Sequence, residues 1–103
     1  MSQRLVLRPE AQSDIAEAAE WYDQQRAGLS LQFRAALDNT PASIEENPRL
    51  HAQVYRNLRR ALVRRFPYAV FYVPRAEALI VVAVLHTARD PHVWRVRFKG
   101  RDG

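Results

Sequence analysis

Hydrophobic and polar positions alternate at the start of the chain and then change to a helical spacing. Residues 3–8 (QRLVLR) alternate polar and apolar side chains before Pro9, which predicts a short strand followed by the first turn of a helix. From Glu10 to about Gln25, apolar residues recur every three or four positions, and acidic residues gather at the beginning of this span. The pattern therefore predicts one amphipathic helix directly after the strand.

A second helical span follows a glycine. Gly28 interrupts the helical spacing, which resumes over residues 29–46 and stops at Asn47 and Pro48. Pro41 lies inside this span, where proline removes a backbone hydrogen bond, so we expect a kink there or a boundary between two shorter helices. Two helices joined by a short glycine-containing link form an antiparallel helical hairpin.

The spacing then becomes extended. Residues 57–66, 68–73 and 78–86 are rich in β-branched and aromatic side chains, which predicts three strands, and residues 74–78 are short enough to join the last two as a hairpin. The last strand is almost entirely apolar, which favours a central position in a sheet. Residues 90–100 (DPHVWRVRFKG) fit either one short helical turn or a brief extended segment.

The predicted order is β-α-α-β-β-β, which indicates an α+β fold with a helical hairpin packed on a small, mainly antiparallel sheet. A length of 103 residues corresponds to a single domain, 1–103. The absence of cysteine excludes disulfides and thiolate metal sites, and we expect neither a metal nor a cofactor. No signal peptide or membrane-spanning run is visible, so we expect a cytoplasmic protein.

The net charge of +5 is divided unevenly along the chain. Up to Val54 there are five arginines against eight acidic residues, whereas from Tyr55 onward eleven basic residues face three acidic ones. Fifteen of the sixteen basic residues are arginine, and Lys99 is the single lysine. Guanidinium groups suit bidentate contact with carboxylate or phosphate, so the second half favours an acidic protein or a nucleic acid as partner. An arginine-rich solvated surface without a partner is the alternative.

Three segments together resemble the RelE/ParE superfamily of type II toxins. They are DIAEAAEWYDQQ at 14–25, RRALVRRFPYAVFYV at 59–73 and VLHTARDPHVW at 84–94, and the likeness covers nearly the whole chain. The resemblance implies the RelE/ParE toxin fold and an antitoxin that binds and neutralises the toxin. It also implies one of two activities, because RelE-like members cut messenger RNA on the ribosome, whereas ParE-like members, the plasmid stabilisation toxins, inhibit DNA gyrase.

Cleavage of RNA needs groups that accept and donate protons, together with cations that hold the phosphate. If the chain is a ribonuclease, its candidate catalytic residues are His86, Arg89, Arg60 and Arg64. Acid–base groups are otherwise scarce, because the central strands hold no Lys or Glu and Phe98 stands where a functional tyrosine is typical of RelE-like enzymes. His51, in the loop before the strands, and His92 do not replace them. We therefore favour a non-catalytic, ParE-like gyrase inhibitor and keep a RelE-like mRNA endonuclease as the alternative.

The candidate target-binding residues lie at the end of the last strand and in the segment that follows it. They are His86, Arg89, Arg95 and Arg97. Structural roles compete with this interpretation, since His86 can hydrogen-bond to backbone or to Asp90, and Asp90 and Pro91 can form a turn that caps the following segment. A relative that keeps the fold as an interaction module, without toxicity, is a third hypothesis.

The partner that the resemblance implies is a ParD-like antitoxin, a DNA-binding ribbon-helix-helix dimer with an acidic tail, so we expect a hetero-oligomer. Such a tail can bind a basic surface with an amphipathic hairpin and exposed strand edges. The candidate apolar contacts are Trp21, Tyr22 and Phe33, and the candidate cations are Arg59, Arg60, Arg64 and Arg65. Strand alternation predicts Arg60 and Arg64 on one face and Arg59 and Arg65 on the other. Trp21 and Tyr22 are consecutive, so one of them is expected at the edge of the helical stripe.

Overall fold

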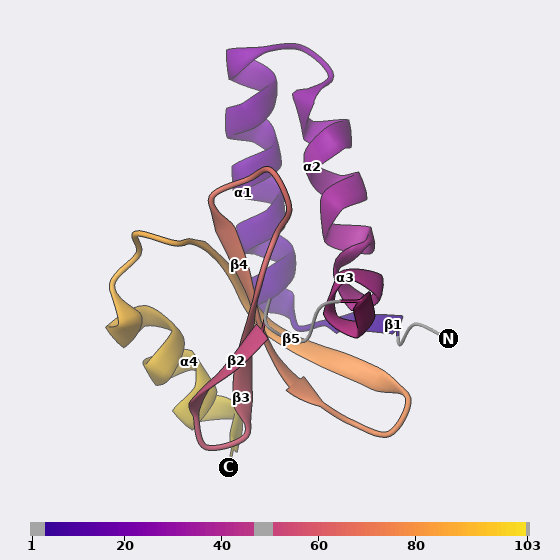
Figure 1. Cartoon of the computed structure of the whole chain (residues 1–103). Coiled ribbons are helices and arrows are strands. Elements are labelled where there is room, and N and C mark those ends of the chain that lie inside the picture. Colours follow the sequence, from indigo (N-terminus) through magenta and orange to yellow (C-terminus); the bar gives the residue numbers. More distant parts are fainter. Residues whose placement is uncertain (1–3, 47–50, 103) are drawn as a thin grey trace.

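The computed structural model describes residues 4–46 and 51–102, which form a five-stranded sheet with helices on both faces (Figure 1). The elements in chain order are β1 (Arg4–Leu7), α1 (Pro9–Gln25), α2 (Leu29–Asp38), α3 (Thr40–Glu46), β2 (His51–Tyr55), β3 (Leu58–Leu62), β4 (Tyr68–Pro74), β5 (Ala78–His86) and α4 (Pro91–Asp102). The strand order is β1-β5-β4-β3-β2; β1 runs parallel to β5, and the other three pairings are antiparallel. The expected α+β architecture with a mainly antiparallel sheet is confirmed.

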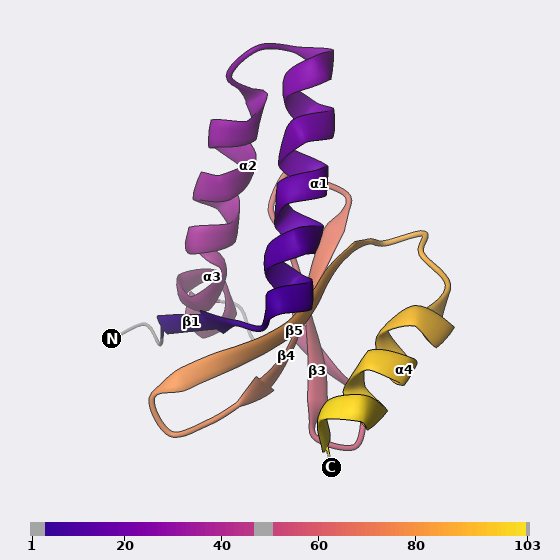
Figure 2. The ribbon, with the colours of Figure 1, turned by 180° about the vertical axis from the view of Figure 1, so that it is seen from behind.

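The hairpin of α1 and α2 covers one face of the sheet (Figure 2). Its apolar stripe packs on alternate side chains of β3, β4 and β5, as strand geometry requires. The buried residues of this first core are Ala11, Ile15, Ala18, Tyr22, Phe33, Leu37, Ala61, Val63, Val70, Tyr72, Leu79, Val81 and Val84. Burial of this stripe fixes the orientation of α1, and with it the polar residues along the edges of the helix.

The link between α1 and α2 depends on two residues. Gly28 has a φ of 88°, in the left-handed region that glycine adopts without steric cost. Asp23 caps the start of α2 from the end of α1, because its Oδ1 accepts the Ser30 N–H at 2.9 Å and its Oδ2 accepts the Ser30 hydroxyl at 2.6 Å. These two hydrogen bonds lower the pKa of Asp23 below its ordinary value of 3.8.

The contribution of the Asp23 cap to the stability of the protein should depend on pH. Because the folded pKa of Asp23 is depressed, the stability it contributes is fully present above its unfolded pKa of 3.8 and is lost as the pH falls through the lower folded value. Asp23→Ala is therefore expected to lower stability at neutral pH, and the difference from the parent should shrink below about pH 4. Urea unfolding at pH 7 and pH 3 measures this. A constant difference at both values would contradict the cap.

The second predicted helix divides at the expected place. Asn39 ends α2, donating its N–H to the carbonyl of Ala35 at 3.1 Å, and α3 begins at Thr40, directly before Pro41. The Thr40 hydroxyl also donates to the carbonyl of Ala36 at 3.2 Å. Proline lacks the N–H that a continuous helix needs here, so the expected boundary is confirmed. The predicted stop at residues 47 and 48 lies outside the described residues.

The sheet differs from the prediction in its first two antiparallel strands. His51 does not lie in a loop, because residues 51–55 form β2, an edge strand that pairs with β3. The predicted strand 57–66 is shorter, ending at Leu62, and Arg65 adopts a φ of 69° in the turn that follows. The chain must reverse direction before Tyr68 to pair β4 with β3, so the residues from 64 onward form a turn and leave the strand alternation.

The last segment is neither a single turn nor extended. Residues 91–102 form the helix α4, which covers the opposite face of the sheet from α1. Asp90 accepts the His92 N–H at 2.8 Å, and Pro91 occupies the first helical position, so the predicted capping role of Asp90 is confirmed. Trp94 stacks on Phe71 with ring centroids 5.3 Å apart. This burial stabilises a helix whose own spacing is weakly amphipathic.

Among the described residues, no helix has both the length and the apolar character that a membrane crossing requires.

The second core, between α4 and the sheet, is formed by Leu58, Ala69, Phe71, Val73, Val82, Ala83, Leu85, Trp94 and Phe98. The two faces of the sheet are thus both covered near β5, as its apolar sequence predicted.

Candidate functional site

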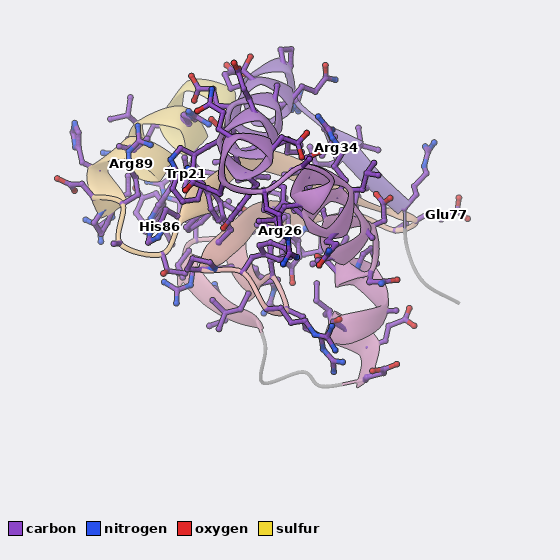
Figure 3. The ribbon with its side chains drawn as sticks, turned by 90° about the horizontal axis from the view of Figure 1, so that it is seen from above. Trp21, Arg26, Arg34, Glu77, His86 and Arg89 are labelled. Carbon is purple, nitrogen blue, oxygen red and sulfur yellow. The ribbon has the colours of Figure 1, made fainter. Side chains whose placement is uncertain are left out.

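The signature at the end of β5 borders an open pocket of about 190 Å³ beside α1. Trp21, His86 and Arg89 lie on this flank of the molecule, well separated from Arg34 and Glu77 (Figure 3). The lining residues are Asp14, Glu17, Ala18, Trp21, Tyr68, Val84, Leu85, His86 and Arg89. The pocket therefore has aromatic side chains from α1 and β4 on its wall and one guanidinium and one imidazole at the end of β5.

A tight turn fixes the orientation of His86. Its carbonyl accepts the Arg89 N–H at 2.9 Å, and its Nδ1 accepts the Ala88 N–H at 3.0 Å. Of the two hydrogen-bond partners expected for His86, the backbone is confirmed, and Asp90 is not the partner of its Nδ1. Because Nδ1 is the acceptor, the neutral imidazole carries its proton on Nε2, which is the nitrogen available to a ligand. The ring also makes an edge contact with Tyr68, with centroids 5.5 Å apart.

Tyr68 borders the pocket together with the charged residues Asp14, Glu17 and Arg89. Its pKa is raised above 10.0, chiefly by burial and further by Glu17 and Asp14, while Arg89 acts in the opposite direction. The hydroxyl is therefore protonated at neutral pH and can donate as well as accept. Glu17 and Arg89 bring an acceptor and a cation to the same pocket as the Tyr68 ring.

Arg97, one of the four candidate target-binding residues, already has a partner within the fold. Its guanidinium forms a bidentate pair with Asp14, with Nη2 and Oδ1 3.0 Å apart, and this bond raises the pKa of Arg97. Asp14 is buried in α1 and also accepts the Val84 N–H at 3.0 Å. The pair therefore fastens α4 to α1 and β5. Arg95 remains exposed, with its guanidinium 5.4 Å from the Trp94 ring.

The four residues of the candidate ribonuclease site do not meet. Arg60 pairs in register with Phe71 and shares the α4 face of the sheet, whereas His86 pairs with Tyr68 and borders the pocket beside α1. Arg64 lies beyond the end of β3 and forms an exposed ion pair with Glu46 at 3.7 Å. Only His86 and Arg89 share a pocket. Such separated groups cannot act together on one phosphate.

The expected arrangement of arginine faces is confirmed for Arg59 and Arg60 and is wrong for Arg64 and Arg65. Arg59 pairs with Tyr72, a residue of the first core, so Arg59 and Arg60 do face opposite sides of β3. Arg64 and Arg65 belong to the turn after the strand, where alternation no longer applies. Together these two arginines border a groove of about 540 Å³ between α2 and the β3–β4 turn. Its lining residues are Leu29, Gln32, Ala35, Ala36, Asn39, Arg64, Arg65 and Phe66.

The three predicted apolar contacts for an antitoxin have different positions. Tyr22 and Phe33 are buried in the first core, where they pack on Phe66 at centroid distances of 5.0 and 5.3 Å, so neither is accessible to a partner. Trp21 is 53% exposed and borders the pocket, which confirms that one of the two consecutive aromatics lies at the edge of the stripe.

Sequence reasoning missed Glu17, Tyr68 and Phe66, which border the pocket or the groove. The signal for Glu17 was its spacing of four from Trp21, which places both on one side of a helix. Tyr68 and Phe66 belong to the FPY motif, but the sequence does not show that Tyr68 borders the pocket whereas Phe66 borders the groove. That difference depends on the geometry of the β3–β4 turn. Within the described ranges, no three His, Asp or Glu residues come close enough to hold a metal ion.

Comparisons with known proteins agree with this fold. A family model described as the ParE toxin of the type II toxin–antitoxin system parDE matches residues 5–91. Toxin ParE2 of Mycobacterium tuberculosis is 26% identical over 102 residues, which cover 98% of this chain and 97% of that protein. Two solved structures at low identity share the fold. That of the chromosomal ParDE system from P. aeruginosa has a TM-score of 0.62 and 10% identity, with 82% of this chain and 96% of that chain covered. That of the toxin–antitoxin complex RelBE2 from Mycobacterium tuberculosis has a TM-score of 0.55 and 16% identity, with 84% and 99% covered. The chain belongs to the ParE toxin family of type II toxin–antitoxin systems.

Proposed function

We propose that the protein inhibits growth by binding DNA gyrase, without catalysis of its own, and that a ParD-like antitoxin neutralises it. We choose gyrase over messenger RNA because the candidate ribonuclease residues lie in three different places. Arg60 is on the α4 face of β3, Arg64 is in the turn after β3, and His86 and Arg89 border the pocket beside α1. A ribonuclease needs its proton-transfer groups and phosphate-binding cations around one bond. A binding toxin needs only a complementary surface.

The target-binding surface in this proposal contains His86, Arg89 and Arg95. The first two border the pocket beside α1, and Arg95 lies on the exposed side of α4, which begins directly after the same turn. Cations at an exposed rim steer association and contribute specificity. Arg97 is excluded from this surface because Asp14 already binds its guanidinium.

The antitoxin is proposed to bind in the groove between α2 and the β3–β4 turn through an acidic, amphipathic tail. The groove has a partly apolar floor, from Leu29, Ala36 and Phe66, and two arginines on one wall. An acidic amphipathic segment matches both features, because its apolar side packs on the floor while its carboxylates pair with Arg64 and Arg65. A tail that is poorly ordered alone gains its order from this surface. The proposed partner is a ribbon-helix-helix dimer, which makes the complex a hetero-oligomer.

The gyrase assay tests the activity directly. Purified toxin is expected to inhibit supercoiling of relaxed plasmid or to trap cleaved DNA, and the double variant His86→Ala/Arg89→Ala should need about tenfold more protein for the same effect, as the loss of one charge-assisted contact predicts. Arg26→Ala, at the exposed end of α1, is the matched control and should behave like the parent.

Two outcomes would overturn the proposal. One is a saturating concentration of folded toxin that leaves supercoiling unchanged and traps no cleaved DNA. The other is codon-dependent cuts in messenger RNA on programmed ribosomes, read by primer extension, because that result assigns the alternative activity.

A further inference from the structure

We propose that the pocket beside α1 binds a guanine nucleotide, either free or as an unpaired residue of a nucleic-acid strand, with the base against Trp21 and Glu17 and the phosphate against Arg89 and His86. This inference does not depend on whether the toxin's target is gyrase. It assigns a ligand to a pocket that the proposed function uses only as part of a binding surface.

Two aromatic side chains, Trp21 and Tyr68, line the pocket. Trp21 is 53% exposed although it is one of the largest apolar side chains in the chain, and Tyr68 borders the same pocket. An exposed indole beside a second ring is the arrangement on which flat bases stack. The volume of about 190 Å³ is smaller than the roughly 300–1,000 Å³ of pockets for drug-sized ligands, so it suits one planar ring system.

The positions of the charges select guanine among the bases. Glu17 lies one helical turn before Trp21 on the same side of α1, and its carboxylate can accept two hydrogen bonds in the plane of a stacked ring. Guanine presents adjacent N1–H and N2–H donors on one edge, whereas adenine presents one donor beside an acceptor. Asp14 does not compete for the base, because Arg97 and the Val84 N–H occupy its oxygens.

The opposite side of the pocket provides for the phosphate. Arg89 supplies a guanidinium, and His86 has its Nδ1 engaged by the Ala88 N–H, so its Nε2–H is the free donor. Both groups are held by the same turn, which the Arg89 N–H closes onto the His86 carbonyl. The acceptor Glu17, the guanidinium of Arg89 and the His86 imidazole thus border one pocket together with the Tyr68 ring.

Titration of the purified toxin with GMP, followed by NMR, tests the assignment. The chain has two tryptophans, and Trp94 is buried against Phe71, so the indole N–H resonance of Trp21 reports on the pocket and that of Trp94 is the internal reference. Trp21→Phe identifies the two resonances. GMP is expected to shift the Trp21 signal alone and to bind at least about tenfold more tightly than AMP, the discrimination that one bidentate base contact supplies.

Two variants separate the halves of the site. Glu17→Gln should remove the preference for GMP over AMP, while Glu20→Gln, an exposed glutamate of the same helix outside the pocket, should preserve it. Arg89→Ala should weaken GMP by about tenfold without changing the binding of guanosine, which has no phosphate. Arg26→Ala is the control for the loss of one arginine.

The source of the nucleotide is decided by comparing GMP with a pyrimidine pentanucleotide that carries one central guanine. Tighter binding of the oligonucleotide indicates a nucleic-acid strand, and equal or weaker binding indicates the free nucleotide. The proposal is overturned if the Trp21 signal is unchanged at about 10 mM GMP, if inorganic phosphate alone reproduces the shift, or if the Glu17→Gln variant keeps the parent's selectivity. Because gyrase is absent from these titrations, their failure leaves the gyrase result intact, and the reverse also holds.

Discussion

Replacing Asp14 by alanine is expected to destabilise the protein by about 3 kcal/mol, because the carboxylate holds three elements at once. Its side chain is buried in α1, binds the guanidinium of Arg97 in α4 and accepts the backbone N–H of Val84 in β5. Alanine leaves the buried Val84 N–H without its acceptor and leaves the Arg97 charge, with a side chain only 23% exposed, without its partner. Urea unfolding measures the change in midpoint.

Two variants distinguish this explanation from a general effect of substitution in α1. Glu20→Ala removes an exposed carboxylate from the same helix and should change stability by less than about 0.5 kcal/mol. Arg97→Met keeps an apolar chain against the body of the protein but leaves the buried Asp14 carboxylate with the Val84 N–H alone, so it should cost a comparable free energy. The double variant Asp14→Ala/Arg97→Met should then be more stable than the sum of the two single effects predicts. Simple additivity would mean that the two side chains act independently.

The sequence predicted the elements whose burial pattern is regular. The apolar positions of α1 and α2 recur at a helical spacing and β5 is an almost unbroken apolar run, and the structure places all three elements as expected. The boundary at Pro41 followed from the missing N–H of proline. These features are local, so neighbouring residues carry the information.

The features that could not be predicted depend on contacts between distant segments. The residues of α4 become helical because Trp94 and Phe98 find a complementary face on the sheet, and a short basic segment gives little local sign of that. The pairing of Arg97 with Asp14 could not be predicted, because the two residues are 83 positions apart in the sequence. The burial of Tyr22 and Phe33 likewise depends on Phe66, which packs on both rings and comes from the distant β3–β4 turn.

Reversing the two arginines of the groove, Arg64→Glu together with Arg65→Glu, is expected to weaken antitoxin binding by about one to two orders of magnitude at low salt. Both side chains border the groove, and an acidic tail that pairs with them meets like charge after the reversal. The ion pair of Arg64 with Glu46 is exposed, so its loss has little effect on folding. Arg95→Glu with Lys99→Glu makes the same change of charge on the exposed side of α4 and is the matched control.

Salt and a second variant decide whether the groove itself is the binding site. Surface charges are screened within about 3 Å at 1 M salt, so the difference between the reversal variant and the parent should shrink as salt is added. Ala35→Trp fills the groove from an exposed position on α2 and should weaken binding equally at low and high salt, mainly through faster dissociation. Steady-state and kinetic binding to the cognate antitoxin give both quantities. If both variants bound as tightly as the parent at either salt, the antitoxin would occupy a different surface, and the arginines of the β3–β4 turn would be solvated without a partner.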